Sequence, residues 1–295
     1  MKQKLLILGG SGFVGNTIIN YAKDDYDVIY SYNKNKFIVP QTTSFQLDLL
    51  CDDFEKIITS YDPDILIHTV AHSSVDLCEN NHEIANQLHV EVTQRISKIC
   101  KNLNTKMIFL STDAVFEGQL NKLYDEDDIP NPVNFYGKTK LEAEKIVLNS
   151  SKKNIVLRTS VIYGWHEKSR FTNWILNYLK EGRCVDPFSD QYNTPTLVND
   201  LAKAILKIIK TNTSGLFHAT GKTCLNRYEF ATLLAKAFSY NLSLIQPVTK
   251  FEKKQDAPRP ISTCLNSKKL EQTINYSFSD IHSGINFLHT QSKTN

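Results

Sequence analysis

The sequence lacks a long hydrophobic run and an excess of charge of either sign. No apolar stretch of the 295-residue chain approaches the roughly 18 residues that a membrane-spanning helix requires. The short apolar run Leu5–Leu8 is followed by glycines rather than by a cleavage site, so no secretion signal is expected. The net charge is only +3, and lysines and acids are interspersed, which disfavours a nucleic-acid-binding surface. We therefore expect a cytoplasmic protein that binds neither membranes nor nucleic acids.

The sequence also has few cysteines, and its six lie far apart without a C-x-x-C pair. In a chain of this size without a secretion signal, such spacing predicts free, buried thiols. No two cysteines or histidines lie at the spacing of zinc ligands on one local element. The acidic run Asp125–Asp128 precedes Pro130 and is expected to be a solvated loop rather than a metal site. No metal is therefore predicted.

The first half of the chain alternates short apolar runs with longer amphipathic stretches. The overall composition, 41% hydrophobic and 22% charged, is that of a globular protein. Short apolar runs suit strands buried on both faces, and their alternation with helices predicts an α/β fold with a doubly wound, Rossmann-type parallel sheet. The expected strands are Leu5–Leu8, Val28–Tyr30, Ile65–Ile67, Met107–Leu110 and Ile155–Leu157. The expected helices are Phe13–Ala22, Asp53–Ser60, Glu83–Asn102 and Asn134–Leu148.

After about Gly164 the alternation loosens, which predicts a smaller C-terminal lobe. Asn226 is placed to cap a helix, and the polar residues from about Thr290 are expected to be frayed. We predict an NADP-binding Rossmann domain over residues 1–164 and a mainly substrate-binding lobe over residues 165–295, with residues 198–220 returning to the sheet. The elements expected in this half are helices at Phe171–Glu181, Val198–Lys210 and Arg227–Phe238, and a strand at Gly215–Ala219.

A glycine loop follows the first expected strand. Gly9, Gly12 and Gly15 have the spacing G-x-x-G-x-x-G, and a helix is expected from Phe13 and Val14 onward. Glycines permit a tight turn and a close approach to a pyrophosphate, and the helix N-terminus offers unpaired N–H groups. The alternative is a plain strand-to-helix turn, but the position directly after a buried strand favours dinucleotide binding.

The end of the second expected strand carries no carboxylate. An acid about 20 residues beyond the loop would bind the 2′-hydroxyl of the NAD ribose. Here hydroxyl and lysine side chains occupy that region, and Asp27 lies at the wrong end of the strand. We therefore predict NADP(H) as the cofactor, with Ser31 and Lys34 near its 2′-phosphate. NAD(H) stays open as the alternative, as does a solvated turn with incidental lysines.

A tyrosine, a lysine and a threonine have the spacing of a reductase site. Tyr136 and Lys140 stand four residues apart on an expected helix and so share a face. A tyrosine donates its proton efficiently when its pKa falls toward neutrality, and a neighbouring ammonium lowers that pKa. Thr112 follows a buried strand at the sheet edge where ligands bind, so its hydroxyl is placed to hydrogen-bond the reacting oxygen. The pair alone arises easily by chance, whereas the three features together indicate a specific site.

Taken together, these motifs resemble the extended short-chain dehydrogenase/reductases and, within them, the dTDP-4-dehydrorhamnose reductase family. The resemblance covers nearly the whole chain. The segments that carry it are Gly12–Gly15, Asp48–Leu49, Val70–Asp76, Cys78–Glu79, Ser111–Gly118, Pro130–Pro132, Tyr136–Glu142, Arg158–Gly164, Asp190–Thr196, Asp200–Ala202 and Arg259–Pro260.

The resemblance assigns expected roles to individual residues. The cofactor pyrophosphate would be held by Gly12, Phe13 and Val14, the adenine would face Asp48 and Leu49, and the rest of the cofactor would be lined by Val70, Ala71 and His72. The substrate would meet Thr112, Asp113 and Val161, Tyr136 would donate the proton, and Lys140 would hold the nicotinamide ribose. Arg259 is a candidate for the diphosphate, because guanidinium groups bind phosphates in two-pronged fashion; the alternative is a surface arginine.

The chain departs from the family pattern at three positions near the expected substrate pocket. His89 stands where the family usually has an asparagine, Ala114 replaces an aromatic residue, and Val161 replaces a tryptophan. These changes bear on the identity of the sugar more than on the hydride chemistry.

The resemblance implies NADPH-dependent reduction of a 4-keto sugar nucleotide, specifically of dTDP-4-dehydro-L-rhamnose to dTDP-L-rhamnose, by a protein that could form a homodimer. One alternative is a nucleotide-sugar epimerase or dehydratase, but Asp113 is followed by alanine rather than by the glutamate usual in dehydratases. Another is a non-catalytic NADP-binding regulatory subunit resembling the methionine adenosyltransferase β subunit. Such subunits can keep the tyrosine and the lysine, so the sequence separates this alternative poorly.

Overall fold

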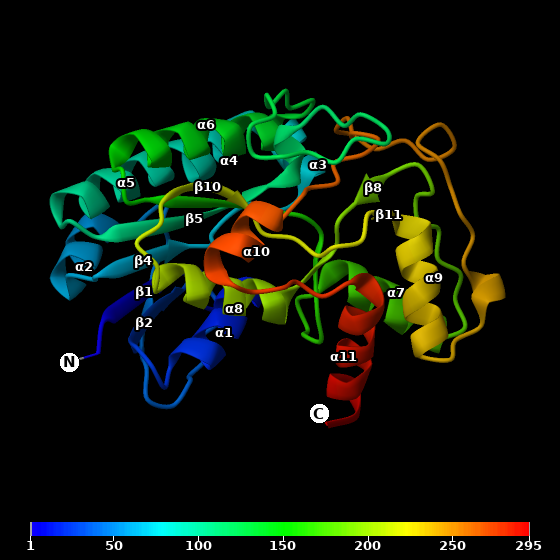
Figure 1. Cartoon of the computed structure of the whole chain (residues 1–295), viewed down its shortest axis with the longest axis horizontal. Coiled ribbons are helices and arrows are strands. Elements are labelled where there is room, and N and C mark those ends of the chain that lie inside the picture. The colour runs from blue at the N-terminus through cyan, green and yellow to red at the C-terminus, as the bar shows by residue number, and fades with distance from the viewer. Residues whose placement is uncertain (1, 295) are drawn as a thin grey trace.

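A seven-stranded parallel sheet forms the centre of the molecule (Figure 1). The computed structural model describes residues 2–294. The strands lie in the order β10-β6-β5-β4-β1-β2-β3, and every neighbouring pair is parallel. The direction of winding reverses between β1 and β4, where doubly wound sheets form their ligand crevice. The strand bounds are β1 Lys4–Leu8, β2 Asp27–Tyr32, β3 Thr43–Gln46, β4 Ile65–His68, β5 Lys106–Thr112, β6 Ile155–Thr159 and β10 Gly215–His218.

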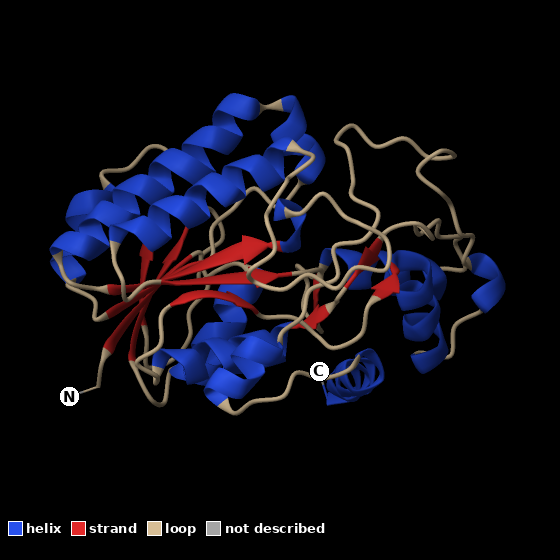
Figure 2. Cartoon of the chain, turned by 45° about the horizontal axis from the view of Figure 1, so that its top comes forward, coloured by secondary structure: helices blue, strands red, loops and turns tan. Residues whose placement is uncertain are grey.

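Helices cover both faces of this sheet (Figure 2), which confirms the predicted fold class. Alternate residues of β1 enter opposite cores: Leu5 packs with one helix layer, while Leu6 packs with the other. Burial on both faces explains why the strands read as continuous apolar runs. One layer contains α1 (Phe13–Ala22), α8 (Val198–Ile209) and α10 (Lys268–Ile274), and the other contains α2 (Phe54–Tyr61), α5 (Val92–Asn102) and α6 (Phe135–Ser150).

The single helix predicted from Glu83 to Asn102 consists of three segments. It comprises α4 (His82–Asn86), a π-helical turn η1 (Gln87–Glu91) and α5. The short helix α3 (Val75–Asn80) precedes them, and Ser74 caps it by accepting a hydrogen bond from Leu77 N–H at 3.3 Å. No glycine or proline marks the π turn in the sequence, so the periodicity predicted one continuous helix.

The C-terminal lobe has its own hydrophobic core between three helices, α7 (Arg170–Lys180), α9 (Arg227–Ala237) and α11 (Ile281–Thr294). Asn226 caps α9 as predicted, in a reciprocal capping box with Glu229. Two small sheets lie in this half: β8 (Tyr192–Asn193) pairs with β11 (Leu225–Asn226), and β7 (Ile162–Tyr163) pairs with β9 (Thr196–Leu197). The residues expected to be frayed from about Thr290 are instead helical as far as Thr294, where α11 ends.

The prediction of free, buried thiols was only partly right. Cys78 and Cys100 are free and buried, but Cys51 and Cys184 are exposed. Cys224 and Cys264 form a disulfide across 40 residues of sequence. Local spacing could not reveal this pair, because the tertiary fold brings the two cysteines together.

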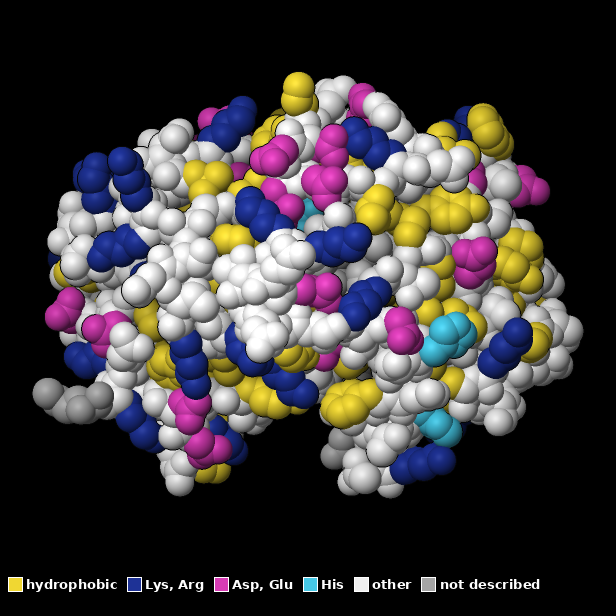
Figure 3. All heavy atoms as spheres, viewed as in Figure 1, with side chains coloured by type: hydrophobic (Ala, Val, Ile, Leu, Met, Phe, Trp, Pro, Cys, Tyr) yellow, Lys and Arg dark blue, Asp and Glu magenta, His cyan; other side chains and the backbone are white. Residues whose placement is uncertain are grey.

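Three features of the described residues bear on what the protein could bind: its surface charges, the length and polarity of its helices, and the grouping of its metal-ligating side chains. Lysine, arginine and acidic side chains are intermixed over the face shown in Figure 3. Among residues 2–294, no helix is both long and apolar enough to cross a bilayer. Over the same residues, no three histidine, cysteine or acidic side chains are grouped so that they could hold a metal ion.

Candidate active site

The glycine loop lies at the carboxyl end of β1 and leads directly into α1. Gly9 has a φ of +85°, which favours glycine, and its carbonyl accepts a hydrogen bond from Gly12 N–H at 2.9 Å. A β-carbon on Gly15 would lie only 2.3 Å from that carbonyl oxygen, so the helix packs closer to the strand than any other residue would allow. A loop without side chains at these positions that leads into a helix N-terminus fits a pyrophosphate.

The two residues predicted near a 2′-phosphate have different surroundings. Ser31 is buried under the glycine loop, and its hydroxyl oxygen accepts a hydrogen bond from Gly9 N–H at 3.1 Å. Lys34 is exposed beyond the end of β2. Asn33 Nδ2 donates to Asp48 Oδ2 at 3.4 Å, which places the predicted adenine-facing pair Asp48 and Leu49 beside this end of β2. The Lys34 side chain is thus more accessible to a 2′-phosphate than the buried, hydrogen-bonded Ser31 hydroxyl.

Tyr136 and Lys140 lie in the first two turns of α6, and their surroundings differ from the expectation. Lys140 Nζ donates to Leu110 O at 2.7 Å and lies 3.9 Å from the centre of the Phe109 ring. Burial lowers the pKa of Lys140 to about 7. Burial also raises the pKa of Tyr136, and the neighbouring Thr112 side chain only partly offsets this. The expected lowering of the Tyr136 pKa by the Lys140 ammonium is therefore wrong for this structure.

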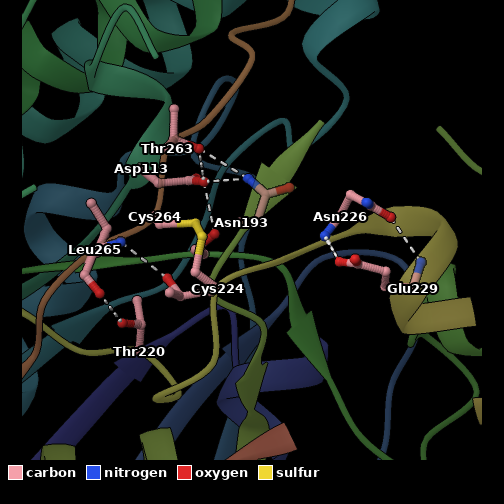
Figure 4. The surroundings of a disulfide bond; sticks show 11 residues. Asp113, Asn193, Thr220, Cys224, Asn226, Glu229, Thr263, Cys264 and Leu265 are labelled. Atoms are coloured by element: carbon pink, nitrogen blue, oxygen red, sulfur yellow. Dashed lines mark hydrogen bonds between the residues drawn. A yellow bond between two sulfur atoms is a disulfide. The ribbon is translucent and has the colours of Figure 1, made fainter. Parts of the chain in front are cut away.

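Asp113 is held by the protein rather than left free for a substrate (Figure 4). Its Oδ2 accepts three hydrogen bonds, from Ser160 Oγ at 2.7 Å, Asn193 Nδ2 at 2.8 Å and Thr263 Oγ1 at 2.6 Å. Its Oδ1 accepts from Thr112 Oγ1 at 3.1 Å. The predicted substrate contact is thus a buried hub that joins the end of β5 to two segments of the C-terminal half.

Comparison with known proteins identifies the family. A family model described as the RmlD substrate binding domain matches residues 3–292. The chain belongs to this family. It is an extended short-chain dehydrogenase/reductase and thus an oxidoreductase by family, as the sequence predicted.

Three proteins illustrate the similarity. The dTDP-4-dehydrorhamnose reductase of Aggregatibacter actinomycetemcomitans is 29% identical over 289 residues, which cover 94% of this chain and 95% of the relative. The methionine adenosyltransferase 2 subunit beta of Pongo abelii is 32% identical over 282 residues, covering 91% and 82%. The crystal structure of dTDP-4-dehydrorhamnose reductase from Bacillus anthracis in complex with NADP has a TM-score of 0.89 and 24% identity, and covers 99% of this chain and 100% of that one.

His89 connects the segment after β4 to α6. Its Nε2 accepts a hydrogen bond from His72 N–H at 3.0 Å, so its Nδ1 carries the proton and donates to Thr139 Oγ1 at 2.8 Å. Thr139 in turn donates to Tyr136 O at 3.0 Å. Burial lowers the pKa of His89 to about 2, which keeps the ring neutral. The predicted cofactor residues Val70, Ala71 and His72 are thereby tied to α6.

Lys168 is a cofactor-site candidate that the sequence did not reveal. It precedes α7, yet its Nζ donates to Ser11 O in the glycine loop at 2.5 Å. The neighbouring His166 ring lies 5.2 Å from the Phe13 ring at the start of α1. This brings a positive charge beside the loop where a pyrophosphate would lie. No local pattern could indicate it, because 157 residues separate the two partners.

The remaining two predicted substrate residues are constrained by the protein itself. Arg259 donates to Asp76 Oδ2 at 2.9 Å and to Ala257 O at 2.9 Å, so a diphosphate would compete with an existing ion pair. Val161 follows β6 with a φ of +35°, a strained conformation for a β-branched residue. Its carbonyl oxygen accepts from Thr196 N–H at 3.1 Å, which holds the strained turn in place.

Proposed function

We propose that this protein catalyses the NADPH-dependent reduction of a 4-keto sugar nucleotide, most specifically of dTDP-4-dehydro-L-rhamnose to dTDP-L-rhamnose. The observation that carries the proposal is that the start of α6, which holds Tyr136, packs beside the carboxyl end of β5, which holds Thr112: Gly137 lies against Ala114 O. The same edge of the sheet presents the glycine loop. Family membership and the similarity to the Aggregatibacter reductase support the same substrate class.

The proposed cofactor site is the glycine loop together with the segment after β4. The loop residues Gly9 to Gly15 would hold the pyrophosphate, with Lys168 as an added positive charge. Since no carboxylate closes β2, we expect NADPH to bind at least as tightly as NADH. The protein of the same fold from Bacillus anthracis was solved with NADP, which agrees with this choice. We also propose a cytoplasmic location and a homodimer.

In the proposed reaction Tyr136 acts as the general acid. Bound NADPH supplies the hydride. Burial raises the pKa of Tyr136, so its hydroxyl carries a proton at neutral pH in the free protein, and this is the proton that it would donate to the oxygen of the reacting carbonyl. Thr112 accepts a hydrogen bond from Ala114 N–H at 3.1 Å and donates to Asp113, so its hydroxyl is held in place beside the tyrosine. Lys140 would hold the nicotinamide ribose.

A spectrophotometric assay with NADPH and the dTDP-linked 4-keto sugar tests the proposal. We expect Tyr136→Phe to lower kcat by about 10²- to 10⁴-fold while NADPH still binds, because only the transferable proton is lost. Tyr178→Phe is the matched control, since Tyr178 is partly buried against the core of the C-terminal lobe. A Tyr136→Phe variant with near wild-type turnover would contradict the assignment.

A second function is favoured by one comparison, the 32% identity to a methionine adenosyltransferase 2 subunit beta. In that case the protein would bind NADP and regulate a partner without reducing a sugar. The same assay separates the two, because a regulatory subunit would bind NADPH but leave its absorbance unchanged when the 4-keto sugar is added.

A further inference from the structure

The Cys224–Cys264 disulfide lies beside the Asp113 hub rather than at a remote surface (Figure 4). Cys224 is exposed and lies directly before β11, whereas Cys264 is fully buried. The bond thus joins the C-terminal lobe's small β8–β11 sheet to the segment that follows the exposed loop around Phe251. Nothing in the proposed reaction uses these sulfurs.

Each cysteine of the disulfide is connected through neighbouring residues to the carboxylate of Asp113. On one arm, Thr263 is the neighbour of Cys264 and donates to Asp113 Oδ2 at 2.6 Å. On the other arm, Leu225 follows Cys224 and is paired across the small sheet with Asn193. Asn193 Nδ2 donates to Asp113 Oδ2 at 2.8 Å and to Thr263 Oγ1 at 2.9 Å. The two donors therefore touch each other as well as the carboxylate.

The Asp113 carboxylate is connected through Thr112 to the region of Tyr136, the proposed general acid. Asp113 Oδ1 accepts from Thr112 Oγ1 at 3.1 Å. The residues after Thr112 pack against the start of α6, because Ala114 O lies against Gly137, the neighbour of Tyr136. A displacement of Thr263 or Asn193 would leave the buried carboxylate with fewer donors, so the Asp113 side chain would reorient toward those that remain. The Thr112 hydroxyl would then lose its fixed acceptor.

We propose that the Cys224–Cys264 disulfide is a positioning cross-link for the catalytic pair, and that its reduction by a dithiol lowers the rate of the reaction. This inference rests on the proposed function. The cross-link holds Thr263 and Asn193 on Asp113, and Asp113 fixes the Thr112 hydroxyl beside Tyr136. Asp113, Asn193 and Thr263 share no hydrogen bond with the glycine loop, so we expect reduction to act on turnover and to leave NADPH affinity unchanged.

The reductive step involves a dithiol and two electrons. A thiolate of the dithiol attacks one sulfur of the bond and displaces the other as a thiolate, which takes up a proton. The second thiol of the reagent then releases the first sulfur and closes as the reagent's own disulfide. The protein gains two thiols, and the reagent loses two electrons and two protons.

Thiol counting establishes the redox state before any assay. After unfolding without reductant, we expect four reactive thiols, from Cys51, Cys78, Cys100 and Cys184. After treatment with dithiothreitol we expect all six. Six reactive thiols in freshly purified protein that no oxidant converts to four would overturn the inference.

Turnover of the two forms is then compared with NADPH and the 4-keto sugar nucleotide. We expect reduction to lower kcat by about 2- to 30-fold with an unchanged KM for NADPH, the range of energetic coupling through connected residues. Cys224→Ser is expected to reproduce the reduced form and to be insensitive to dithiothreitol. The matched control is Cys184→Ser, which removes an exposed free thiol and should keep the full response to reduction.

Variants of Thr263 test whether the effect passes through the hub. Thr263→Ser keeps the hydroxyl and is expected to respond to reduction like the wild type. Thr263→Val removes the donor to Asp113, so its kcat is expected to be low already and to fall no further on reduction. Additive effects of reduction and Thr263→Val would overturn the proposed route from the disulfide to Tyr136.

A spectroscopic measurement separates this inference from the proposed function. In protein with ¹³C-labelled tyrosine, the Tyr136 resonance, assigned with Tyr136→Phe, is expected to shift on reduction in the wild type but not in Cys224→Ser. The Tyr136 resonance could shift on reduction while neither the disulfide-bonded nor the reduced protein oxidises NADPH with the 4-keto sugar nucleotide. In that case the cross-link inference stands and the proposed function fails. If turnover occurs and neither resonance nor kcat responds to reduction, the cross-link inference fails alone.

Discussion

The charge of Lys140 would serve the proposed reaction, but burying that charge lowers the stability of the fold. The proposed reaction would use this lysine beside the nicotinamide ribose, but in the free protein its ammonium is buried against Phe109 and donates to Leu110 O. Burial lowers the pKa of Lys140 to about 7 from 10.5. Between pH 7 and 10.5 the unfolded chain binds a proton that the folded protein releases, so this group makes the protein more stable as pH rises through that window.

We therefore expect Lys140→Met to lose turnover and to gain stability. At pH 6 the free energy of unfolding is expected to increase by about 1–4 kcal/mol, because a buried charge is replaced by an apolar side chain of similar size. The gain shrinks toward pH 10, where the wild-type lysine is neutral. Urea titrations at both pH values measure it. Lys138→Met, on the exposed face of the same helix, is the control and should change stability by less than about 0.5 kcal/mol. Equal stabilities of Lys140→Met and wild type at pH 6 would contradict the argument.

Among the elements, the π-helical turn η1 has the most direct consequence for the site. Such turns commonly occur at functional sites. Here the turn carries His89, whose two ring nitrogens link the segment after β4 to α6. Nε2 accepts from His72 in the proposed cofactor segment, and Nδ1 donates to Thr139 on α6, which carries the proposed general acid.

Two substitutions of His89 separate these two links. Glutamine places an acceptor near the position of Nε2, while asparagine places a donor near that of Nδ1. We expect His89→Gln to keep NADPH affinity close to wild type. We expect His89→Asn to weaken NADPH binding by about 2- to 12-fold, since the hydrogen bond from His72 N–H is lost, a cost of about 0.5–1.5 kcal/mol. Fluorescence titration of NADPH checks the order, and the reverse order would refute the role given to the His72 contact.

Elements with strong periodicity could be predicted, and weakly patterned ones could not. Helix α1 begins and ends at the predicted residues, and the five early strands contain the predicted cores. Strand β3 was missed because it lies at the sheet edge with no buried residue, so its pattern is not apolar. The short helices α3 and α10 have too few residues to show a helical period.

In the candidate site, too, residues that belong to local motifs could be predicted from the sequence, whereas contacts made by the tertiary fold could not. Tyr136, Lys140 and the glycines could be named from the sequence, because each motif is contained within one turn or helix. The partners of these residues could not, since Asn193 and Thr263 lie 80 and 150 residues from Asp113. The orientation of Lys140 toward Leu110 O is likewise a product of packing between α6 and β5. The sequence motifs therefore identify the residues of the candidate site, whereas their orientations and interaction partners are known only from the fold.

At the scale of the whole molecule, three buried histidines make stability depend on pH. Burial lowers the pKa of His68 to about 3, of His89 to about 2 and of His218 to about 3. All three are therefore neutral in the folded protein at pH 5, while in the unfolded chain they titrate near 6.5. Between pH 3 and 6.5 the unfolded chain binds protons that the folded protein does not. Their stabilising contribution is thus complete above pH 6.5 and is lost as pH falls.

We expect the free energy of unfolding to fall by about 2 kcal/mol per histidine between pH 8 and pH 5, which together approaches the total stability of a typical domain. His218→Leu tests this, because neither ring nitrogen of His218 has a hydrogen-bond partner and the ring packs against Phe116. The variant should reduce the slope of stability against pH below 6.5 by about 1.4 kcal/mol per pH unit, the value for one proton. His282→Leu, at an exposed histidine, should leave the slope unchanged. Denaturant titrations from pH 5 to 8 measure both, and an unaltered slope in His218→Leu would show that this histidine is not a source of acid sensitivity.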